Sequence, residues 1–333
     1  MNIFTKKTVA LIVVLVALAA AAWYMFGSAA GGLDYPNADK YTGGDAEITG
    51  AVNSLFVDWT SGKVTVEYWD GAAVSVSETA SRTLSADEKL RWWLDGDMLR
   101  IRFMKPGLRL SFNLDKQLTV RLPRGLILKS ADISATSGDL RIPILNADEI
   151  RLETTSGSIE AATNTKVLSA RSTSGGVSLA QEGDLDSAVL SSTSGGLALS
   201  LKGSVKTVSL DSTSGGAALS VSGRAEDVKM RSTSGGLAAV LESADRAEIS
   251  STSGGAAVSA VAFGDLKVNT TSGGVGLDLG TEPGFTCKVS TASGDFTTDL
   301  AMTKNGDTWT CGDGSAKCTV STTSGDIRLG KAE

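Results

Sequence analysis

Hydrophobic and polar residues alternate with a period of two through most of the chain after residue 50. The alternation is clearest on both sides of a recurring Thr-Ser-Gly triplet, where the residues seven and five before the glycine and two and four after it are almost always apolar. Around Gly235 these four residues are Val228, Met230, Leu237 and Ala239. Alternation of this kind is typical of a β-strand with one buried face, whereas residues two apart on a helix point in different directions. Each triplet therefore predicts a turn between two short strands.

The triplet, or a close variant of it, recurs at a nearly constant spacing. Its glycine occupies positions Gly62, Gly138, Gly157, Gly175, Gly195, Gly215, Gly235, Gly254, Gly273, Gly294 and Gly325. From Gly138 to Gly294 neighbouring triplets are 18 to 21 residues apart. A two-strand block of about 20 residues cannot bury an apolar face alone and becomes stable when other blocks stack on it. The sequence therefore predicts an all-β protein, a parallel β-solenoid with about 20 residues per winding, in which successive blocks stack in chain order.

The triplet glycine is interpreted as a corner residue between the two strands. A chain that turns sharply favours a residue with positive φ, and glycine adopts this conformation without steric cost. In the blocks from Gly175 to Gly273 a second glycine follows the first, which predicts an especially tight corner. The Thr and Ser before the glycine are small and can hydrogen-bond the corner backbone, so we expect them to stack as ladders in successive blocks.

The pattern divides the part of the chain that follows residue 45 into two regions. Residues 131–330 form the regular repeat, and residues 46–130 form a less regular N-terminal part of the same solenoid. In the irregular part, alternating segments flank Asp95-Gly96, which predicts a hairpin. It also contains four tryptophans, Trp59, Trp69, Trp92 and Trp93. We expect this part to cap the solenoid, because an open end exposes strand edges and core.

The N-terminal segment predicts a membrane anchor. Lys6 and Lys7 precede an apolar run over residues 9–26, which would span about 27 Å as a helix. We therefore expect a cytoplasmic N-terminus at residues 1–7, a transmembrane helix at 8–27, a linker at 28–45 and the remainder outside the cell membrane. The alternative is a signal peptide cleaved near residues 28–30, although the apolar run is longer than the usual 7 to 15 residues of such peptides.

Composition excludes several classes of function. The chain contains no histidine, so a Ser-His-Asp triad, a Cys-His dyad and any His-ligated metal site are excluded. Its net charge is −6 and it contains no basic run, so nucleic acid is not expected as a partner. Because no carboxylate pair recurs in adjacent blocks, a polysaccharide-active enzyme is the least favoured class. We expect no catalytic residue, no metal and no cofactor.

The chain has three cysteines, Cys287, Cys311 and Cys318. Cys287 and Cys318 each lie seven residues before a triplet glycine, at a position that faces the core. They are interpreted either as small buried hydrophobes or as disulfide partners. The disulfide would join Cys311 to Cys318 around residues 312–314, or Cys287 to Cys318 across stacked windings.

A stripe of small residues is predicted on the outer surface. Three residues after the glycine, the outward position is occupied in five consecutive blocks by Ala198, Ala218, Ala238, Ala257 and Gly276. The stripe is either a docking face for a partner or a second copy, or merely the composition that suits a thin, crowded sheet.

Several segments together carry a family resemblance. They are WTSGKV at residues 59–64, LRI at 99–101, LTVRLP at 118–123 and TSGDI at 323–327, with the serial triplets between the last two. In this order they resemble the toast-rack family of putative bacterial adhesins over roughly residues 45–330. The resemblance implies a β-helix-like domain, often beside a transmembrane segment, in proteins of the bacterial cell envelope and its stress-response systems. It transfers no catalytic residue to this chain.

These observations predict a non-enzymatic binding or scaffolding module of the cell envelope, anchored by one membrane span and involved in envelope-stress sensing. Its expected partners are the membrane and an envelope or membrane protein, with self-association left open. The alternative is a surface adhesin or a self-assembling structural element.

Overall fold

The computed structural model describes residues 34–107 and 114–332. No helix within these two ranges is long and apolar enough to cross a membrane. The anchor predicted at residues 8–27 and the N-terminal segment before it lie outside the described residues.

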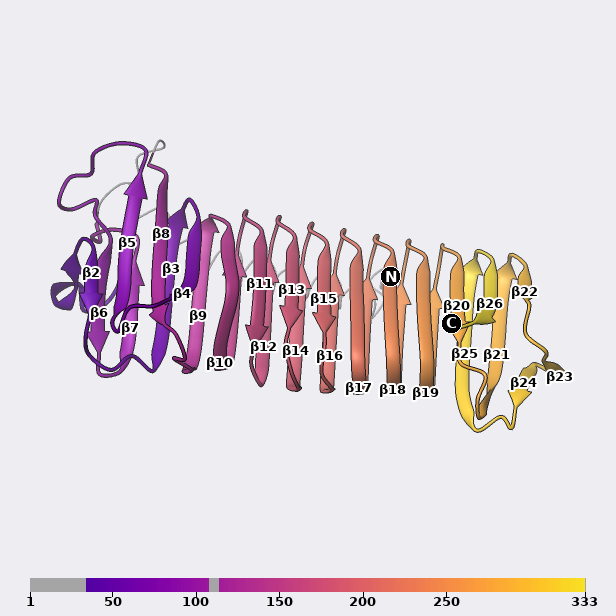
Figure 1. Cartoon of the computed structure of the whole chain (residues 1–333). Helices are drawn as coiled ribbons and strands as arrows, with labels where there is room; N and C mark the ends of the chain where they lie inside the picture. The colour runs from indigo at the N-terminus through magenta and orange to yellow at the C-terminus, as the bar shows by residue number, and fades with distance from the viewer. Residues whose placement is uncertain (1–33, 108–113, 333) are drawn as a thin grey trace, which may run out of the picture.

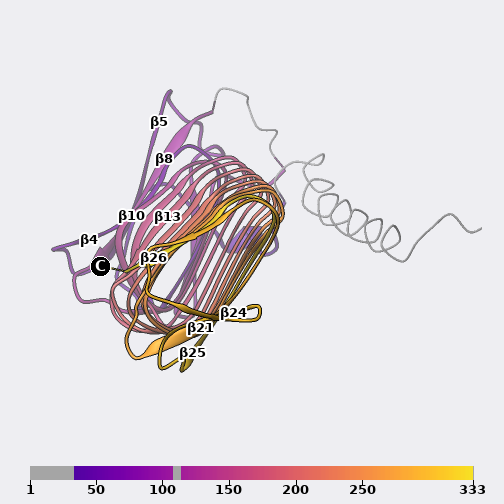
Figure 2. The same cartoon turned by 90° about the vertical axis from the view of Figure 1, so that its right-hand side faces the viewer.

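Strands of the described chain form one continuous sheet that winds into a rod. Figure 1 shows the strands side by side along the rod, and the view along its axis in Figure 2 shows each winding as a narrow closed path around a shared interior. The regular windings are built from β9 (Leu128–Ser137), β10 (Leu140–Thr154), β11 (Ile159–Asn164), β12 (Val167–Ser172), β13 (Val177–Gln181), β14 (Leu185–Ser192), β15 (Leu197–Leu201), β16 (Val205–Ser212), β17 (Ala217–Ser232), β18 (Leu237–Ser251), β19 (Ala256–Thr270) and β20 (Val275–Leu279).

Parallel pairing between consecutive windings confirms the predicted solenoid. Equivalent positions of neighbouring blocks are direct register partners, as in the column formed by Leu190, Leu210, Met230 and Ile249. All four side chains are buried, together with the other inward positions of the repeat. One narrow hydrophobic core therefore runs along the rod, because each block covers the apolar face of its neighbour.

At the C-terminal end the windings do not follow chain order. This end contains β21 (Gly284–Ser293), β22 (Phe296–Thr298), β23 (Thr303–Asn305), β24 (Thr308–Gly312), β25 (Ala316–Ser324) and β26 (Ile327–Lys331). Strand β25 pairs with β19 on one side and with β21 on the other, and β26 lies between β20 and β22 in the same way. The Gly325 winding is thus inserted between the windings of Gly273 and Gly294, and the prediction of stacking in chain order is wrong here.

The N-terminal end has the same kind of insertion. It contains a 3₁₀ helix (Ala38–Lys40), β1 (Thr42–Gly43), β2 (Ala46–Ile48), β3 (Ser54–Ser61), β4 (Val64–Trp69), β5 (Val74–Ala80), β6 (Arg91–Asp95), β7 (Met98–Arg102) and β8 (Lys116–Pro123). Strand β3 lies between β7 and β9, and β4 between β8 and β10. The first winding in sequence is therefore the second in space, which also departs from chain order.

Antiparallel strands cover both ends of the parallel stack. At the N-terminal end, β5 pairs with β8 and β6 with β7, and the second pair is the hairpin predicted at Asp95-Gly96. At the other end, β24 pairs with β21 and β23 with β24. These strands satisfy edges that a solenoid otherwise leaves open.

Residues 34–45 belong to the N-terminal cap, although the sequence predicted a linker over residues 28–45. Tyr35 and Tyr41 are buried, and β1 pairs with β6. The hydroxyl of Tyr35 donates a hydrogen bond to the carbonyl oxygen of Met104 at 3.0 Å. This segment is ordered because its two aromatic rings pack against the cap, as the edge-to-face contact between them shows.

Candidate functional site

The triplet glycines stack directly on one another along one edge of the rod. Positive φ is found at Gly62 and Gly294, whereas the other nine triplet glycines are not among the residues with positive φ. At Gly195, for example, a Cβ atom would overlap the carbonyl group of Gly175 in the preceding winding. The predicted turn residues are therefore in place, but the explanation by positive φ is wrong for most of them, where close approach of two backbones excludes any side chain.

Hydrogen bonding at these turns comes from a residue that the sequence interpretation passed over. In the six blocks from Gly157 to Gly254, the Ser or Thr directly before the triplet is buried, and its hydroxyl accepts a hydrogen bond from the triplet glycine, as from Gly235 N to Ser232 Oγ at 2.8 Å. The same hydroxyl donates to the carbonyl oxygen of Gly215 in the neighbouring winding at 3.2 Å. The triplet's own Thr233 and Ser234 are exposed. The repetition of Ser or Thr at this inward position was the available signal.

The small-residue stripe is brought together in register, as predicted. Ala198, Ala218, Ala238, Ala257 and Gly276 are successive partners on five neighbouring strands. At about 4.8 Å between windings, the stripe is roughly 20 Å long.

A shallow groove of about 600 Å³ lies over part of this stripe. The second outward position of the same strands adds Ser200, Ser220 and Val240 to its lining, and the side chain of Val240 is 56% exposed. We call the outward surface formed by these two columns between Ser178 and Ser259 the uncharged face. It offers small apolar groups and hydroxyls to a ligand, and no ionisable group.

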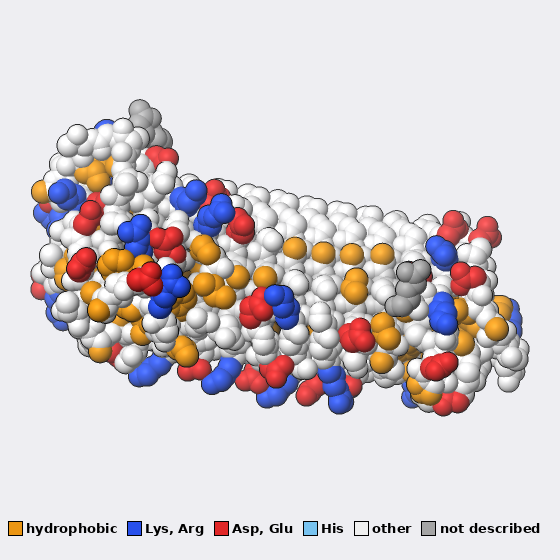
Figure 3. All heavy atoms as spheres, in the orientation of Figure 1, with side chains coloured by type: hydrophobic (Ala, Val, Ile, Leu, Met, Phe, Trp, Pro, Cys, Tyr) orange, Lys and Arg blue, Asp and Glu red, His pale blue; other side chains and the backbone are white. Residues whose placement is uncertain are grey.

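Charged side chains lie at the two ends of the uncharged face, and at one end Arg141 and Glu160 also line the groove. Arg141 and Glu160 face each other at 4.0 Å at one end of the stripe, and Arg328 lies 3.7 Å from Asp299 at the other. In Figure 3 charged groups gather at both ends of the rod and along its lower edge, while a row of hydrophobic side chains crosses the middle windings.

A ladder of ion pairs joins neighbouring windings. These pairs are Lys166 with Asp148, Lys206 with Asp186, Lys202 with Glu182, and Arg224 with Asp245. Because these charges are already paired, they attract a charged ligand less strongly than unpaired charges would.

A polar trough of about 810 Å³ runs along the strands that precede the triplets. Its lining is mainly Ser and Thr, with Arg171, Arg231 and Asp211. Asp211 is the one carboxylate among these lining residues, whereas hydrolysis of a glycosidic bond usually requires two. In the described part of the chain, moreover, no group of three Cys, Asp or Glu residues is placed to bind a metal ion.

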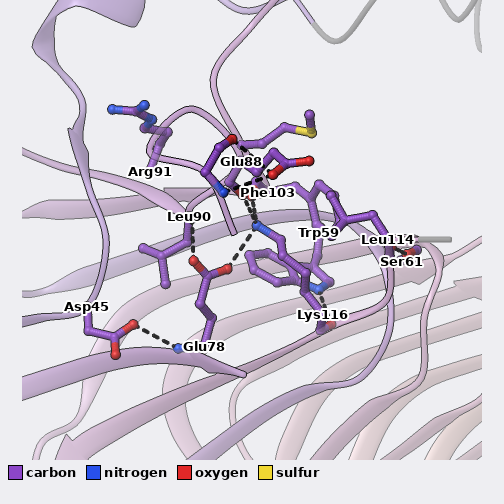
Figure 4. A network of polar contacts seen from close by, with 12 residues as sticks. Asp45, Trp59, Ser61, Glu78, Glu88, Leu90, Arg91, Phe103, Leu114 and Lys116 are labelled. Atoms are coloured by element: carbon purple, nitrogen blue, oxygen red, sulfur yellow. Dashed lines mark hydrogen bonds and ion pairs between the residues drawn. The ribbon is translucent and has the colours of Figure 1, made fainter. Parts of the chain in front are cut away.

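A buried ionic network lies inside the N-terminal cap (Figure 4). Lys116 is fully buried, and its Nζ lies 2.8 Å from Oε2 of Glu78. The same Nζ donates hydrogen bonds to the carbonyl oxygens of Glu88, at 2.7 Å, and of Phe103. It also lies over the rings of Trp59 and Phe103, at 5.0 and 4.2 Å from their centroids.

This network is closed to chemistry. Burial lowers the pKa of Lys116, while the hydrogen bond and the charge of Glu78 oppose that change. The ammonium group donates hydrogen bonds to the two carbonyl groups and has Glu78 as its ion-pair partner. Glu78 also accepts a hydrogen bond from the backbone nitrogen of Leu90 at 2.7 Å. We therefore assign this cluster to fastening the cap.

All three cysteines are buried thiols in the structure. Cys287 on β21 is the direct register partner of Cys318 on β25. Cys311 on β24 is opposite Phe285, on the other side of β21. The predicted pairing of Cys311 with Cys318 does not fit, because β21 separates the two strands and places their Cα atoms at least about two strand spacings apart.

Comparison with known proteins agrees with the fold. The model of the family described as Toastrack DUF4097 matches residues 52–263 and 165–330. The chain belongs to this family. The resemblance found in the sequence is thereby confirmed, and the Toastrack match covers the regular windings and the part of the irregular cap that follows residue 51. No curated protein matches the chain significantly.

Three solved structures resemble this Toastrack chain at low identity. A putative cell adhesion protein from Clostridium sporogenes is 10% identical, with 88% of this chain and 100% of that chain covered and a TM-score of 0.25. A putative lipid binding protein from Parabacteroides distasonis is 15% identical, with 72% of this chain and 94% of that chain covered and a TM-score of 0.42. A putative adhesin from Bacteroides fragilis is 14% identical, with 87% of this chain and 97% of that chain covered and a TM-score of 0.33. Similarity at this level carries no argument about function.

Proposed function

We propose that this Toastrack chain is a membrane-anchored, extracytoplasmic binding and scaffolding module of the bacterial cell envelope, and that it has no catalytic activity. The observation that carries the proposal is the uncharged face, where the register stacks Ala198, Ala218, Ala238 and Ala257 without an intervening charge. The apolar run at residues 9–26 supports anchoring. A role in envelope-stress sensing, suggested by the family resemblance, is the finer part of the proposal.

The uncharged face favours an extended segment of an envelope protein as its partner. Its length of about 19 Å over five windings and its width of two outward positions are small beside a standard interface of about 800 Å² per partner. A narrow segment with small, uncharged side chains can lie along the stripe without burying an unpaired charge. A ligand with net charge would instead be attracted to the charged side chains at the two ends of this face.

Photo-crosslinking in intact cells tests this proposal. A photoreactive residue in place of Ala218 should give a specific crosslinked product, because Ala218 lies in the middle of the face. The same residue in place of Thr213 is the matched control, since Thr213 is exposed on the polar trough of the same winding. Loss of the Ala218 product in an Ala198→Lys, Ala238→Lys variant is expected. Equal products from both positions, or none from Ala218, would contradict docking on this face.

Self-assembly is the second candidate function, favoured by the same small, uncharged and repetitive surface, which is complementary to a second copy of itself. Sedimentation of the full chain in detergent separates the two. A concentration-dependent dimer that the Ala198→Lys, Ala238→Lys change abolishes would favour the structural or adhesive role, whereas a monomer with a crosslinked partner would favour the scaffold.

A further inference from the structure

The last windings place two cysteines against each other. Strands β21 and β25 are parallel neighbours, and Cys287 and Cys318 occupy the same register position. Both side chains face the core, with exposed fractions of 0% and 3%. Neighbouring strands are about 4.8 Å apart, which lies within the range of about 4.4–6.8 Å between the Cα atoms of disulfide-bonded cysteines.

The other two pairings are disfavoured by the same register. Cys311 and Cys318 lie on opposite sides of β21 and opposite different residues of it, Phe285 and Cys287, so their Cα atoms are more than about 9.6 Å apart, beyond the reach of a disulfide. Cys311 is diagonal to Cys287, whose direct partner in β24 is Trp309, and diagonal neighbours lie about 7–8 Å apart. Of the three possible bonds, the register fits one.

We propose that Cys287 and Cys318 form a disulfide bond that fastens the inserted last winding to the terminal winding of the rod. The proposal rests on the extracytoplasmic location proposed above, because structural disulfides persist in oxidising compartments. The oxidant is a disulfide, either of glutathione or of a thiol oxidoreductase. One cysteine thiolate attacks it and releases its first thiol, and the second cysteine then displaces the other, so that two protein thiols become one disulfide and the oxidant becomes two thiols.

The position of the bond gives it a structural role. Strand β25 follows a hairpin of antiparallel strands and must enter between β19 and β21, which are not paired with each other. A covalent link between β25 and β21 holds this insertion and protects the terminal winding against fraying. Cys318 has its pKa raised by contact with the Cys287 thiol and by burial, so little reactive thiolate is present after folding. We therefore expect the bond to form while the last winding closes.

Tryptic peptide mapping tests the pairing directly. Lys267, Lys288, Lys304, Lys317 and Arg328 divide this region so that each cysteine falls in its own peptide, at residues 268–288, 305–317 and 318–328. The full chain is refolded in a glutathione redox buffer, alkylated and digested without reduction. The expected product joins 268–288 to 318–328 with the loss of two hydrogen masses, and leaves 305–317 alkylated. A dominant link to 305–317, or alkylation of all three peptides, would overturn the proposal.

Variants and cells complete the experiment. Cys311→Ser is the matched control and should retain the linked product, whereas Cys287→Ser should lose it. The same map from cells quenched with acid and alkylated tests the compartment. A linked product there supports the proposal in full. A product that forms in glutathione buffer and is absent from cells would overturn the extracytoplasmic location while the pairing itself stands.

Discussion

At Gly195 the backbones of two windings meet so closely that a methyl group has no room beside the carbonyl group of Gly175. One residue later, at Gly196, the nearest atom to an added Cβ is the carbonyl oxygen of Gly216, at 3.7 Å. This is ordinary van der Waals distance, and Gly196 is not among the residues with positive φ. Two adjacent glycines that look equivalent in the sequence are therefore under different constraints.

Alanine at the two positions should separate these constraints. We expect Gly195→Ala to lower the free energy of unfolding by about 3 kcal/mol, because the windings must move apart to accommodate the new methyl group. Gly196→Ala should change it by less than about 1 kcal/mol, and in the stabilising direction, because alanine restricts the unfolded chain. Urea unfolding followed by circular dichroism measures both. Equal destabilisation by the two variants would contradict the role of close approach.

At the scale of elements, strand β8 is held to the cap by an ion pair whose two side chains are both buried. Lys116 on this strand is buried with Glu78, whose side chain is 5% exposed, whereas most ion pairs of the described chain lie on the surface. Removing one member of a buried pair leaves its partner charged and unsolvated, which costs far more than breaking an exposed pair.

Replacing two paired lysines by methionine measures this difference. Lys116→Met should lower the free energy of unfolding by about 3–5 kcal/mol, because Glu78 is left without a counterion. Lys129→Met is the matched control: Lys129 pairs with Asp97 at 3.4 Å, but its side chain is 70% exposed, and the loss should stay below about 1 kcal/mol. A small loss at Lys116 would contradict this role, because methionine removes the ion pair, the hydrogen bonds to the two carbonyl groups and the contacts with the aromatic rings together.

The segment before β1 supplies a pH-dependent contact to the same cap. Burial raises the pKa of Tyr35 to about 12, while Arg91 and Arg102 partly oppose this change. In the unfolded chain the phenol ionises near its ordinary pKa of about 10. The contribution of Tyr35 to the free energy of unfolding is therefore complete below about pH 10 and is lost as the pH rises toward about 12. Over this interval the free energy of unfolding, measured with urea, should fall more steeply for the wild type than for Tyr35→Phe. Parallel curves would show that Tyr35 is as accessible in the folded state as in the unfolded state.

Across the whole molecule, the sequence predicts the repeat more completely than the order of its copies. Inward positions are identified by alternation, because a residue at the core must be apolar whichever neighbour it meets. Nothing in the Gly325 block distinguishes Gly273 from Gly294 as its neighbour, since all three blocks present similar inward residues. The stripe was predictable because its members lie in the regular windings, where chain order and spatial order agree. The Lys116 cluster was not, because it joins residues that only the inserted end windings bring together.

This difference between middle and ends predicts how the rod responds to shortening. Deleting residues 216–235 joins Gly215 to Gly236 and leaves Leu210 to stack on Ile249, so the register and the core remain continuous. We expect a folded rod that is shorter by about 4.8 Å, measured by small-angle X-ray scattering. Truncation after residue 283 removes β25 and β26 and exposes β19 and β20 to solvent. Because an open parallel edge is a template for pairing with another chain, that variant should aggregate. If the internal deletion aggregated and the truncated rod stayed monomeric, the insertion of the last winding would have no role in closing the end.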